Sequence, residues 1–360
     1  MIGNLEITDS QGVKIYYSYT RHKWVVLVVL VILVLAMAFI SINAGASSIS
    51  LLSVLRALVG LETRRTSNII WHIRLPRVAA AIVAGAGFGV TGCVMQNNLK
   101  NPLASPSTLG ITHAAAFGAN IAIILLNAGT ALYTASGEII INNPYLVTTC
   151  AFCFSMGAAF LILTLGKIKG FSPEAVVLAG IALGSLFTAG ITIIQYFATD
   201  IQITAAIFWT FGDLSRVTWK EIHLITVVVI LPSIYFFTKR WDYNALDHGE
   251  DVARSLGVNV ARSRFYGLLL SSLITAVTVS FMGIIAFIGL IAPHIMRRFV
   301  GTDHRFLIPA SMLCGSFLLL TADTLARTVI SPVVLPVGAF TSLLGAPMFI
   351  YLLLKGYKRK

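Results

Sequence analysis

Charged residues are scarce in this chain, and their scarcity excludes an ordinary soluble protein. Only 11% of the 360 residues are charged, whereas 57% are hydrophobic. Soluble globular domains carry roughly 25% charged residues. The length would allow two or three soluble domains, but long apolar runs occupy most of it. We therefore predict an all-α polytopic membrane protein that forms one unit.

Nucleotide-binding and catalytic motifs are also missing. The sequence contains no G-x-x-x-x-G-K-[ST], so the chain does not bind ATP through a P-loop of its own. Acids or histidines near the middle of a span, which a proton-driven carrier would need, are not found. Asp323 and Arg327 lie one helical turn apart near the end of a span and could pair. A self-contained carrier or channel is disfavoured, and an intramembrane enzyme has no credible catalytic constellation.

The chain has only four cysteines, all in apolar runs, which argues against a disulfide framework. Cys150 and Cys153 form a C-x-x-C, a spacing that raises metal or redox chemistry in soluble chains. No histidine or second cysteine pair lies near them. We interpret them as polarizable packing residues on a helix, and we expect no metal site.

Basic residues exceed acidic ones, which gives a net charge of +12. They lie mainly between and beside the apolar runs, so we interpret them as membrane-orienting charge rather than a surface for nucleic acid. A crossing helix needs about 20 apolar residues, and ten runs qualify. They cover residues 24–42, 78–95, 109–128, 145–165, 173–198, 222–238, 265–282, 283–299, 306–330 and 336–354. The seventh and eighth adjoin, with only Gly283 to separate them.

Residues 1–23 are predicted to be a cytoplasmic leader, and residues 24–360 the ten-helix domain. The first apolar run is longer than that of a signal peptide, so we interpret it as a retained anchor. With both termini in the cytoplasm, most of the 26 lysines and arginines also fall on that side. This orientation places Arg74 and Arg77 outside, against the usual rule.

Three connections stand out between the spans. Residues 95–110 are apolar for a loop, so they should pack against helices. Residues 239–264 contain a short amphipathic stretch that Gly257 can end; it is either a surface helix or a docking element. Residues 200–219 resemble an interfacial helix, with Trp209 and Trp219 near headgroup level.

Several segments together resemble the FecCD family, the cobalamin-importer-like permeases of ABC importers for iron chelates, haem and cobalamin. The resemblance runs from about residue 74 to 355. It rests on "RLPR" (74–77), "NPLA" (101–104), "LAGIALG" (178–184), "GEDVARSLGVNVAR" (249–262), "GIIAFIGLIAPHIMRRFVGTDHR" (283–305), "ADTLAR" (322–327) and "LPVGAFTSLLGAPMFIYLLL" (335–354). Several of these are modest singly, but their order and spacing are specific.

The resemblance implies a permease subunit in the cell membrane that alternates access and is not itself an enzyme. Its expected partners are a second permease subunit, identical or paralogous, two cytoplasmic ATPase subunits, an extracytoplasmic binding protein and the lipid bilayer. No cofactor is expected in this chain, since the ATPase would bind ATP and Mg²⁺. The substrate would be a siderophore, haem or cobalamin, and relatives that carry molybdate or tungstate are the alternative.

The resemblance also implies roles for individual residues. Arg74, Arg77 and Arg327 match arginines that receive acidic residues of the binding protein; snorkelling or pairing within the subunit is the alternative for each. A segment in residues 239–264 matches the helix that couples to the ATPase, with Gly249, Glu250, Ala253, Arg254, Leu256 and Gly257. Gly184, Ser185, Thr188 and Gln195 are expected to line the path, unless they serve ordinary helix packing.

The chain departs from the family pattern at three positions. Ser105 stands where an acid is common, His113 replaces a small polar residue, and His248 replaces an apolar one. A haem-ligand role is conceivable for His113. A lone histidine near the start of a helix is more often a hydrogen-bonded packing residue, and we interpret His113 in that way.

Overall fold

The structure is a computed structural model that describes residues 3–44, 51–128, 143–168, 172–330 and 333–357, and these parts contain helices and no strand. The helices in chain order are α1 (Gly3–Asn43), α2 (Leu51–Leu58), α3 (Arg64–Ile69), the π-helix η1 (Ile70–Arg74), α4 (Leu75–Asn98), α5 (Ile111–Asn120), the π-helix η2 (Ile121–Leu125), α6 (Pro144–Ile168), α7 (Pro173–Tyr196), α8 (Asp200–Thr210), the 3₁₀-helix η3 (Leu214–Arg216), α9 (Trp219–Thr238), α10 (Arg240–Asp247), α11 (Glu250–Ser255), α12 (Val260–Met282), α13 (Ile288–Val300), α14 (His304–Thr328) and α15 (Val337–Tyr357).

A helix lies at each of the ten predicted spans. Seven helices of the described chain are long and apolar enough to cross a membrane, and two shorter apolar helices are Ile111–Leu125 and Val337–Ile350. The remaining predicted span was wrong in its bounds. Residues 283–287 are not helical, and α13 has only 13 residues, about 20 Å of helix against a hydrocarbon core of about 30 Å.

The break before α13 has a physical cause in two backbone conformations. Gly283 caps the end of α12 with a φ of 76°, and Phe287 adopts a φ of 67° directly before α13. The first is easy for glycine, whereas the second is uncommon for a residue with a side chain. The sequence correctly marked Gly283 as the break, but apolarity alone could not show that four more residues leave the helix.

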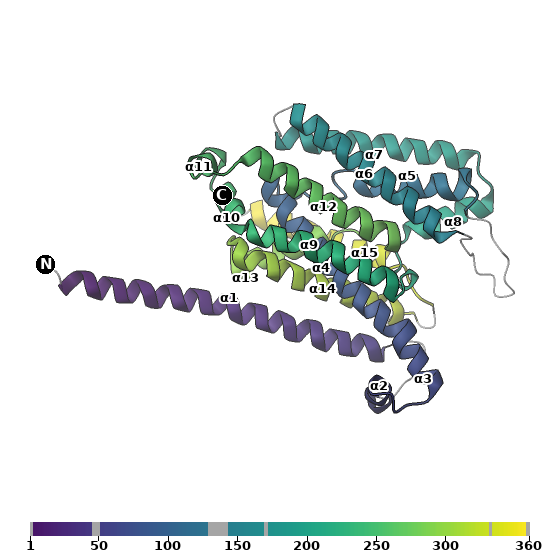
Figure 1. The fold of residues 1–360 in the computed structure, drawn as a ribbon, viewed down its shortest axis with the longest axis horizontal. Coiled ribbons are helices and arrows are strands. Elements are labelled where there is room, and N and C mark those ends of the chain that lie inside the picture. The colour runs from purple at the N-terminus through teal and green to yellow at the C-terminus, as the bar shows by residue number, and fades with distance from the viewer. Residues whose placement is uncertain (1–2, 45–50, 129–142, 169–171, 331–332, 358–360) are drawn as a thin grey trace.

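Helix α4 forms the centre of the bundle, where it packs against α14, α12, α13 and α9 (Figure 1). Its glycines allow the close approach. A Cβ added to Gly85 would lie 2.4 Å from the carbonyl oxygen of Gly315, and one added to Gly89 would lie 2.1 Å from that of Ser311. The G-x-x-x-G of Gly85 and Gly89, a weak signal in the sequence, therefore faces α14.

Two further groups of helices surround this centre. Helix α1 packs along α14, and its N-terminal half projects beyond the bundle (Figure 1). The helix begins at Gly3, so the boundary between leader and span at residue 23 is one of composition and not of secondary structure. Helices α5, α6 and α7 form a second layer, in which α5 contacts both others and α6 contacts α12.

The predicted connections are also helical in part. Helix α4 continues to Asn98, so the connection expected at residues 95–110 begins at Leu99. The helix expected within residues 200–219 is present as α8, followed by the short η3. Trp209 is only 3% exposed, so its ring packs against the protein rather than offering a surface to lipid. Helix α11 ends before Gly257, whose φ is 83°, as the sequence predicted.

Candidate functional site

The predicted docking arginines meet at one end of the bundle, around a buried carboxylate. The Asp323 side chain is fully buried and is shared by two arginines. Arg77 Nε donates to Asp323 Oδ1 at 2.8 Å, and Arg327 Nε donates to Oδ2 at 3.0 Å. The sequence correctly predicted that Asp323 and Arg327 could pair. We call Arg74, Arg77, Asp323 and Arg327 the Asp323 cluster.

The same cluster closes the end of α1. The last carbonyl groups of a helix have no partner within the helix, and arginines bind them here. Arg74 Nη1 donates to the carbonyl oxygens of Ile42 and Asn43 at 2.7 and 3.1 Å. Arg327 donates to the carbonyl oxygen of Ala44 at 2.9 Å and to Ser41 Oγ at 2.7 Å. The cluster thus joins α1, α4 and α14.

Sequence analysis offered pairing within the subunit as the alternative to docking for these arginines. The contacts described above are pairing of that kind. Arg74 and Arg77 are 5% and 8% exposed, so little of either side chain reaches the surface. Arg77 also lies 3.8 Å from a carboxylate oxygen of Asp213. The sequence could not show that Arg77 pairs with Asp323, because 246 positions separate them.

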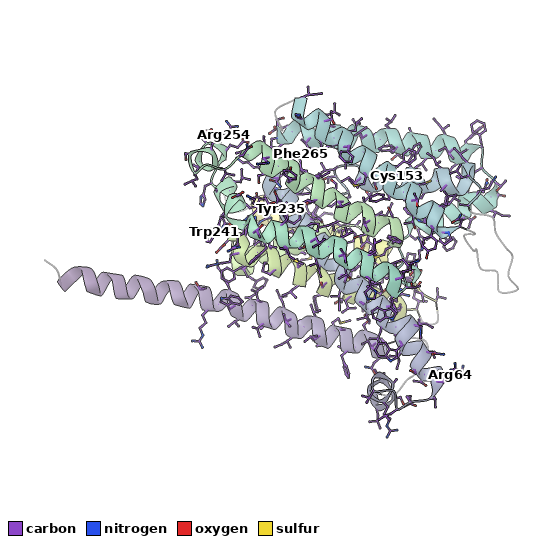
Figure 2. The ribbon with its side chains drawn as sticks, viewed as in Figure 1. Arg64, Cys153, Tyr235, Trp241, Arg254 and Phe265 are labelled. Atoms are coloured by element: carbon purple, nitrogen blue, oxygen red, sulfur yellow. The ribbon has the colours of Figure 1, made fainter. Side chains whose placement is uncertain are left out.

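Arginines that sequence analysis did not single out are exposed near this end. Arg56 on α2 and Arg64 and Arg65 on α3 all face outward. Figure 2 places Arg64 at the end of the molecule opposite Arg254. None of the three lies in a motif on which the family resemblance rests.

The predicted coupling residues lie at the opposite end, where their side chains divide into two groups. Ala253 is fully buried and Glu250 Oε1 accepts a 2.7 Å hydrogen bond from Arg264 of α12, so these two hold α11 against the protein. Leu256 is 68% exposed, and Arg254 is exposed as well, with only a 3.4 Å contact to Glu250. Gly249 and Gly257 have φ values of 119° and 83°, which allow the turns on either side of α11.

The Arg264 hydrogen bond holds the pKa of Glu250 below its usual value. A carboxyl group with a lowered pKa stabilises the folded state above its ordinary pKa, and this contribution is lost as the pH falls through the lowered value. The attachment of α11 is therefore complete at neutral pH.

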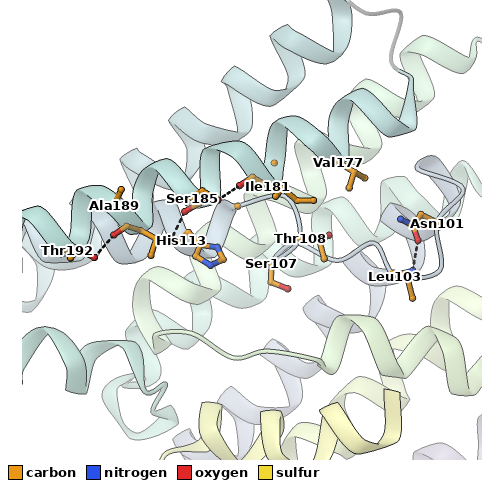
Figure 3. Close-up of a pocket in the computed structure, with 14 residues that line it drawn as sticks. Asn101, Leu103, Ser107, Thr108, His113, Val177, Ile181, Ser185, Ala189 and Thr192 are labelled. Atoms are coloured by element: carbon orange, nitrogen blue, oxygen red, sulfur yellow. Dashed lines mark hydrogen bonds between the residues drawn. The ribbon is translucent and has the colours of Figure 1, made fainter. Parts of the chain in front are cut away.

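A cavity of about 770 Å³ lies between α7 and the segment that leads into α5 (Figure 3). Three of the four predicted path residues line it, namely Gly184, Ser185 and Thr188. The fourth does not, because the Gln195 side chain turns away and donates to Asn120 Oδ1 at 2.9 Å. We call this space the hydroxyl cavity, since its polar lining is mainly Ser107, Thr108, Ser185, Thr188 and Thr192, with Asn101 and His113.

The hydroxyl groups of the cavity suit passage rather than tight binding. Ser185 donates to the carbonyl oxygen of Ile181, and Thr188 donates to that of Gly184. Each hydroxyl has therefore used its one donor within α7 and can only accept further hydrogen bonds. His113 is exposed to this cavity, where its ring lies beside Gly184 of α7.

The described residues contain no group of three or more histidine, cysteine or acidic side chains placed to hold a metal ion. Cys150 and Cys153 are both free thiols, and Cys153 is exposed on α6 (Figure 2).

Comparison with known proteins extends over nearly the whole chain. The profile of the FecCD transport family matches residues 30–355. An ABC transporter permease protein of Methanocaldococcus jannaschii is 52% identical over 96% of this chain and 98% of its own. The hemin transport system permease protein HmuU of Yersinia pestis is 36% identical, over 88% of this chain and 91% of its own. A solved metal-chelate type ABC transporter in an inward-facing conformation superimposes with a TM-score of 0.77 at 29% identity, covering 92% of this chain and 99% of that one.

Proposed function

Because this chain belongs to the FecCD transport family and is a membrane-embedded permease subunit of an ABC importer, we propose that it carries an iron chelate, haem or cobalamin along the hydroxyl cavity. The observation that carries the proposal is this cavity of about 770 Å³, whose wall is largely apolar and whose hydroxyl groups mainly offer hydrogen-bond acceptors. Relatives that are permeases for hemin and for metal chelates support the substrate class. ATP and Mg²⁺ would bind to the separate ATPase subunits.

The proposed orientation places both termini and residues 239–264 in the cytoplasm, with the Asp323 cluster outside. The distribution of basic residues supports it. The exposed side chains of Arg254 and Leu256 would then meet the ATPase. Glu250 and Ala253 would fix the helix that presents them, since both are held against the protein.

A second permease subunit is proposed to cover α7. This helix is strongly apolar, yet only 11% of its span is buried within the subunit. Leu178, Leu186 and Ile193 are each more than 60% exposed. Lipid would satisfy such a surface, but α7 also forms one wall of the hydroxyl cavity. A second copy or a paralogue would close that cavity into a path.

We expect the exposed arginines to guide the binding protein, together with the excess positive charge of the Asp323 cluster. The double substitution Arg64→Glu and Arg65→Glu should weaken association with the loaded binding protein by about tenfold at low salt, because complementary charge steers docking. The loss should shrink at high salt. Surface plasmon resonance with the permease in nanodiscs measures this.

Arg74→Glu with Arg77→Glu is the companion variant, and it tests the buried arginines named from the sequence. Since it also breaks the Asp323 cluster, its thermal midpoint must be measured alongside. If the folded Arg64/Arg65 variant binds the loaded binding protein with wild-type affinity at low salt, Arg64 and Arg65 do not belong to the docking surface.

The proposed path through the hydroxyl cavity can be tested by narrowing the cavity. Ser185→Trp should lower transport about tenfold or more, because the exposed side chain would fill the space where a bulky ligand passes. The fold should survive, since Ser185 faces open space. Leu161→Trp on α6 is the matched control, because Leu161 is 48% exposed away from the cavity. Uptake of radiolabelled chelate by vesicles is the measurement, and equal rates for both variants would place the path elsewhere.

A further inference from the structure

Helix α4 ends in three consecutive buried amide side chains, Gln96, Asn97 and Asn98. They are 3%, 4% and 1% exposed. Burying polar groups is costly unless they are hydrogen-bonded, so the hydrogen-bond partners of the Gln96 and Asn97 side chains show what this turn holds. Gln96 Nε2 donates to the carbonyl oxygen of Leu290 on α13 at 3.2 Å. The other two positions connect to the coupling segment, residues 239–264.

Asn97 holds the end of α10. Its Nδ2 donates to Asp247 Oδ1 at 2.6 Å and to the carbonyl oxygen of Tyr243 at 3.1 Å. Asp247 is the last residue of α10, and its other carboxylate oxygen lies 3.6 Å from His304 Nδ1 at the start of α14. Burial raises the pKa of Asp247, and the hydrogen bond from Asn97 opposes that shift.

The backbone of Asn98 holds the start of α11 through Arg264, whereas its buried side-chain amide has no hydrogen-bond partner among the described residues. The Arg264 side chain is 3% exposed. Its Nε donates to the carbonyl oxygen of Asn98 at 2.9 Å, and its Nη2 donates to Glu250 Oε1 at 2.7 Å. The last residue of α10 and the first residue of α11 are therefore both bonded, directly or through one arginine, to the final turn of α4.

The same turn of α4 leads into the wall of the hydroxyl cavity. The Asn101 backbone N–H donates to the carbonyl oxygen of Gln96 at 3.2 Å, which fixes the exit of the chain from α4. Asn101, Leu103, Ser107 and Thr108 of the following segment then line the cavity. A displacement of α10 and α11 as a unit must move this turn or break its hydrogen bonds.

We propose that Asn97, Asp247 and Arg264 form a joint that transmits ATPase-driven movement of the coupling segment to the wall of the hydroxyl cavity. These are positioning residues, and they need not touch substrate or ATP. The inference rests on the proposed coupling role of residues 249–257. It adds a defined route from that surface to the path, through one turn of one helix.

The test uses the assembled complex of permease, ATPase and binding protein in proteoliposomes, with molecules transported per ATP hydrolysed as the readout. Asn97→Asp replaces the donor amide with a carboxylate of nearly the same shape that faces Asp247 and the Tyr243 carbonyl. We expect assembly and basal ATP hydrolysis to persist and the transport ratio to fall about tenfold, within the usual range of coupling between sites.

A double variant that exchanges the two side chains, the swapped pair, distinguishes loss of the Asn97–Asp247 hydrogen bond from general damage to the fold. In Asn97→Asp with Asp247→Asn, a carboxylate again faces an amide, so the ratio should recover by about threefold or more. Asp247→Ala is the second single variant, because the Asp247 side chain is 31% exposed and its truncation leaves little cavity. Asn143→Ala is the matched control, since Asn143 is exposed and its side chain accepts a hydrogen bond from the Leu146 N–H in the first turn of α6, far from the joint.

The outcomes distinguish this proposal from the one on which it rests. Arg254→Glu should weaken assembly with the ATPase, and normal assembly would contradict the coupling surface itself. If Arg254→Glu behaves as expected while Asp247→Ala and Asn97→Asp keep the wild-type transport ratio, the joint is overturned and the coupling surface stands. Failure of the swapped pair to recover any coupling would also overturn the joint.

Discussion

Asp323→Asn is expected to destabilise the permease by about 3–5 kcal/mol, the usual cost of removing one partner from a buried ion pair. The carboxylate is fully buried and binds both Arg77 and Arg327. Asparagine keeps the shape but removes the charge, and its amide would point donors at one of the two guanidinium groups. Thermal unfolding of the purified protein in detergent measures the effect.

Asp213→Asn provides the matched control for this prediction. The Asp213 side chain is 37% exposed and lies 3.8 Å from Arg77. A contact this long to a partly exposed carboxylate contributes about 0–1 kcal/mol, and Arg77 keeps its bond to Asp323, so the control should unfold close to the wild-type midpoint. Equal midpoints for the two variants would show that the Asp323 cluster does not hold α1, α4 and α14 together.

Gly92→Ala should be at least as damaging, for a steric reason. A Cβ at this position would lie 1.6 Å from the carbonyl oxygen of Gly289. No side chain can move aside there, because the obstacle is backbone at the start of α13. Overpacking costs about 1–3 kcal/mol and more in rigid sites. We expect a loss of about 3 kcal/mol or more, seen as a lower yield of monodisperse protein and a lower thermal midpoint.

Gly157→Ala is the control that separates this steric effect from helix propensity. Gly157 lies within α6, and a Cβ added there meets nothing within 4 Å. Alanine is a better helix former than glycine by about 1 kcal/mol, so this variant should be neutral or slightly stabilised. A Gly92→Ala protein with the yield and midpoint of Gly157→Ala would mean that α4 and α13 are not packed as closely as the structure shows.

Local chemistry carried most of what could be predicted from the sequence. Apolar length located a helix at each expected span, and glycine marked the ends of α11 and α12 at Gly257 and Gly283. The spacing of Asp323 and Arg327 correctly predicted their pairing. Family motifs identified the transport class, and three of four predicted path residues do line a cavity.

The features that sequence analysis missed all depend on tertiary contacts. Arg77 looked available for docking because its partner, Asp323, is distant in the chain. Gln195 was grouped with the path residues on polarity, yet Asn120 draws it away. Trp209 suggested an interface by residue type, whereas packing buries it. His113 looked like an ordinary packing residue, because nothing local shows that it lines a cavity beside Gly184 of α7.

Helix α4 connects the Asp323 cluster to the coupling segment at the other end of the molecule. Helix α4 begins in the Asp323 cluster and ends in the turn that holds α10 through the Asn97 side chain and α11 through the Asn98 backbone carbonyl and Arg264. It is also the most central helix, in contact with α9, α12, α13 and α14. Any change at the coupling segment that shifts α4 along its axis would therefore strain the hydrogen bonds of Arg74 and Arg77. This arrangement fits a permease whose two ends open alternately.

The most direct test of the central claim is chelate uptake by proteoliposomes that contain this permease with or without its ATPase. We predict that labelled ferric siderophore, haem or cobalamin, supplied on its binding protein, enters only when permease, ATPase and ATP are all present. Vesicles with permease alone should show no uptake above empty vesicles. Uptake by the permease alone, without ATPase or ATP, would contradict the assignment of this chain as the passive path of an ATP-driven importer.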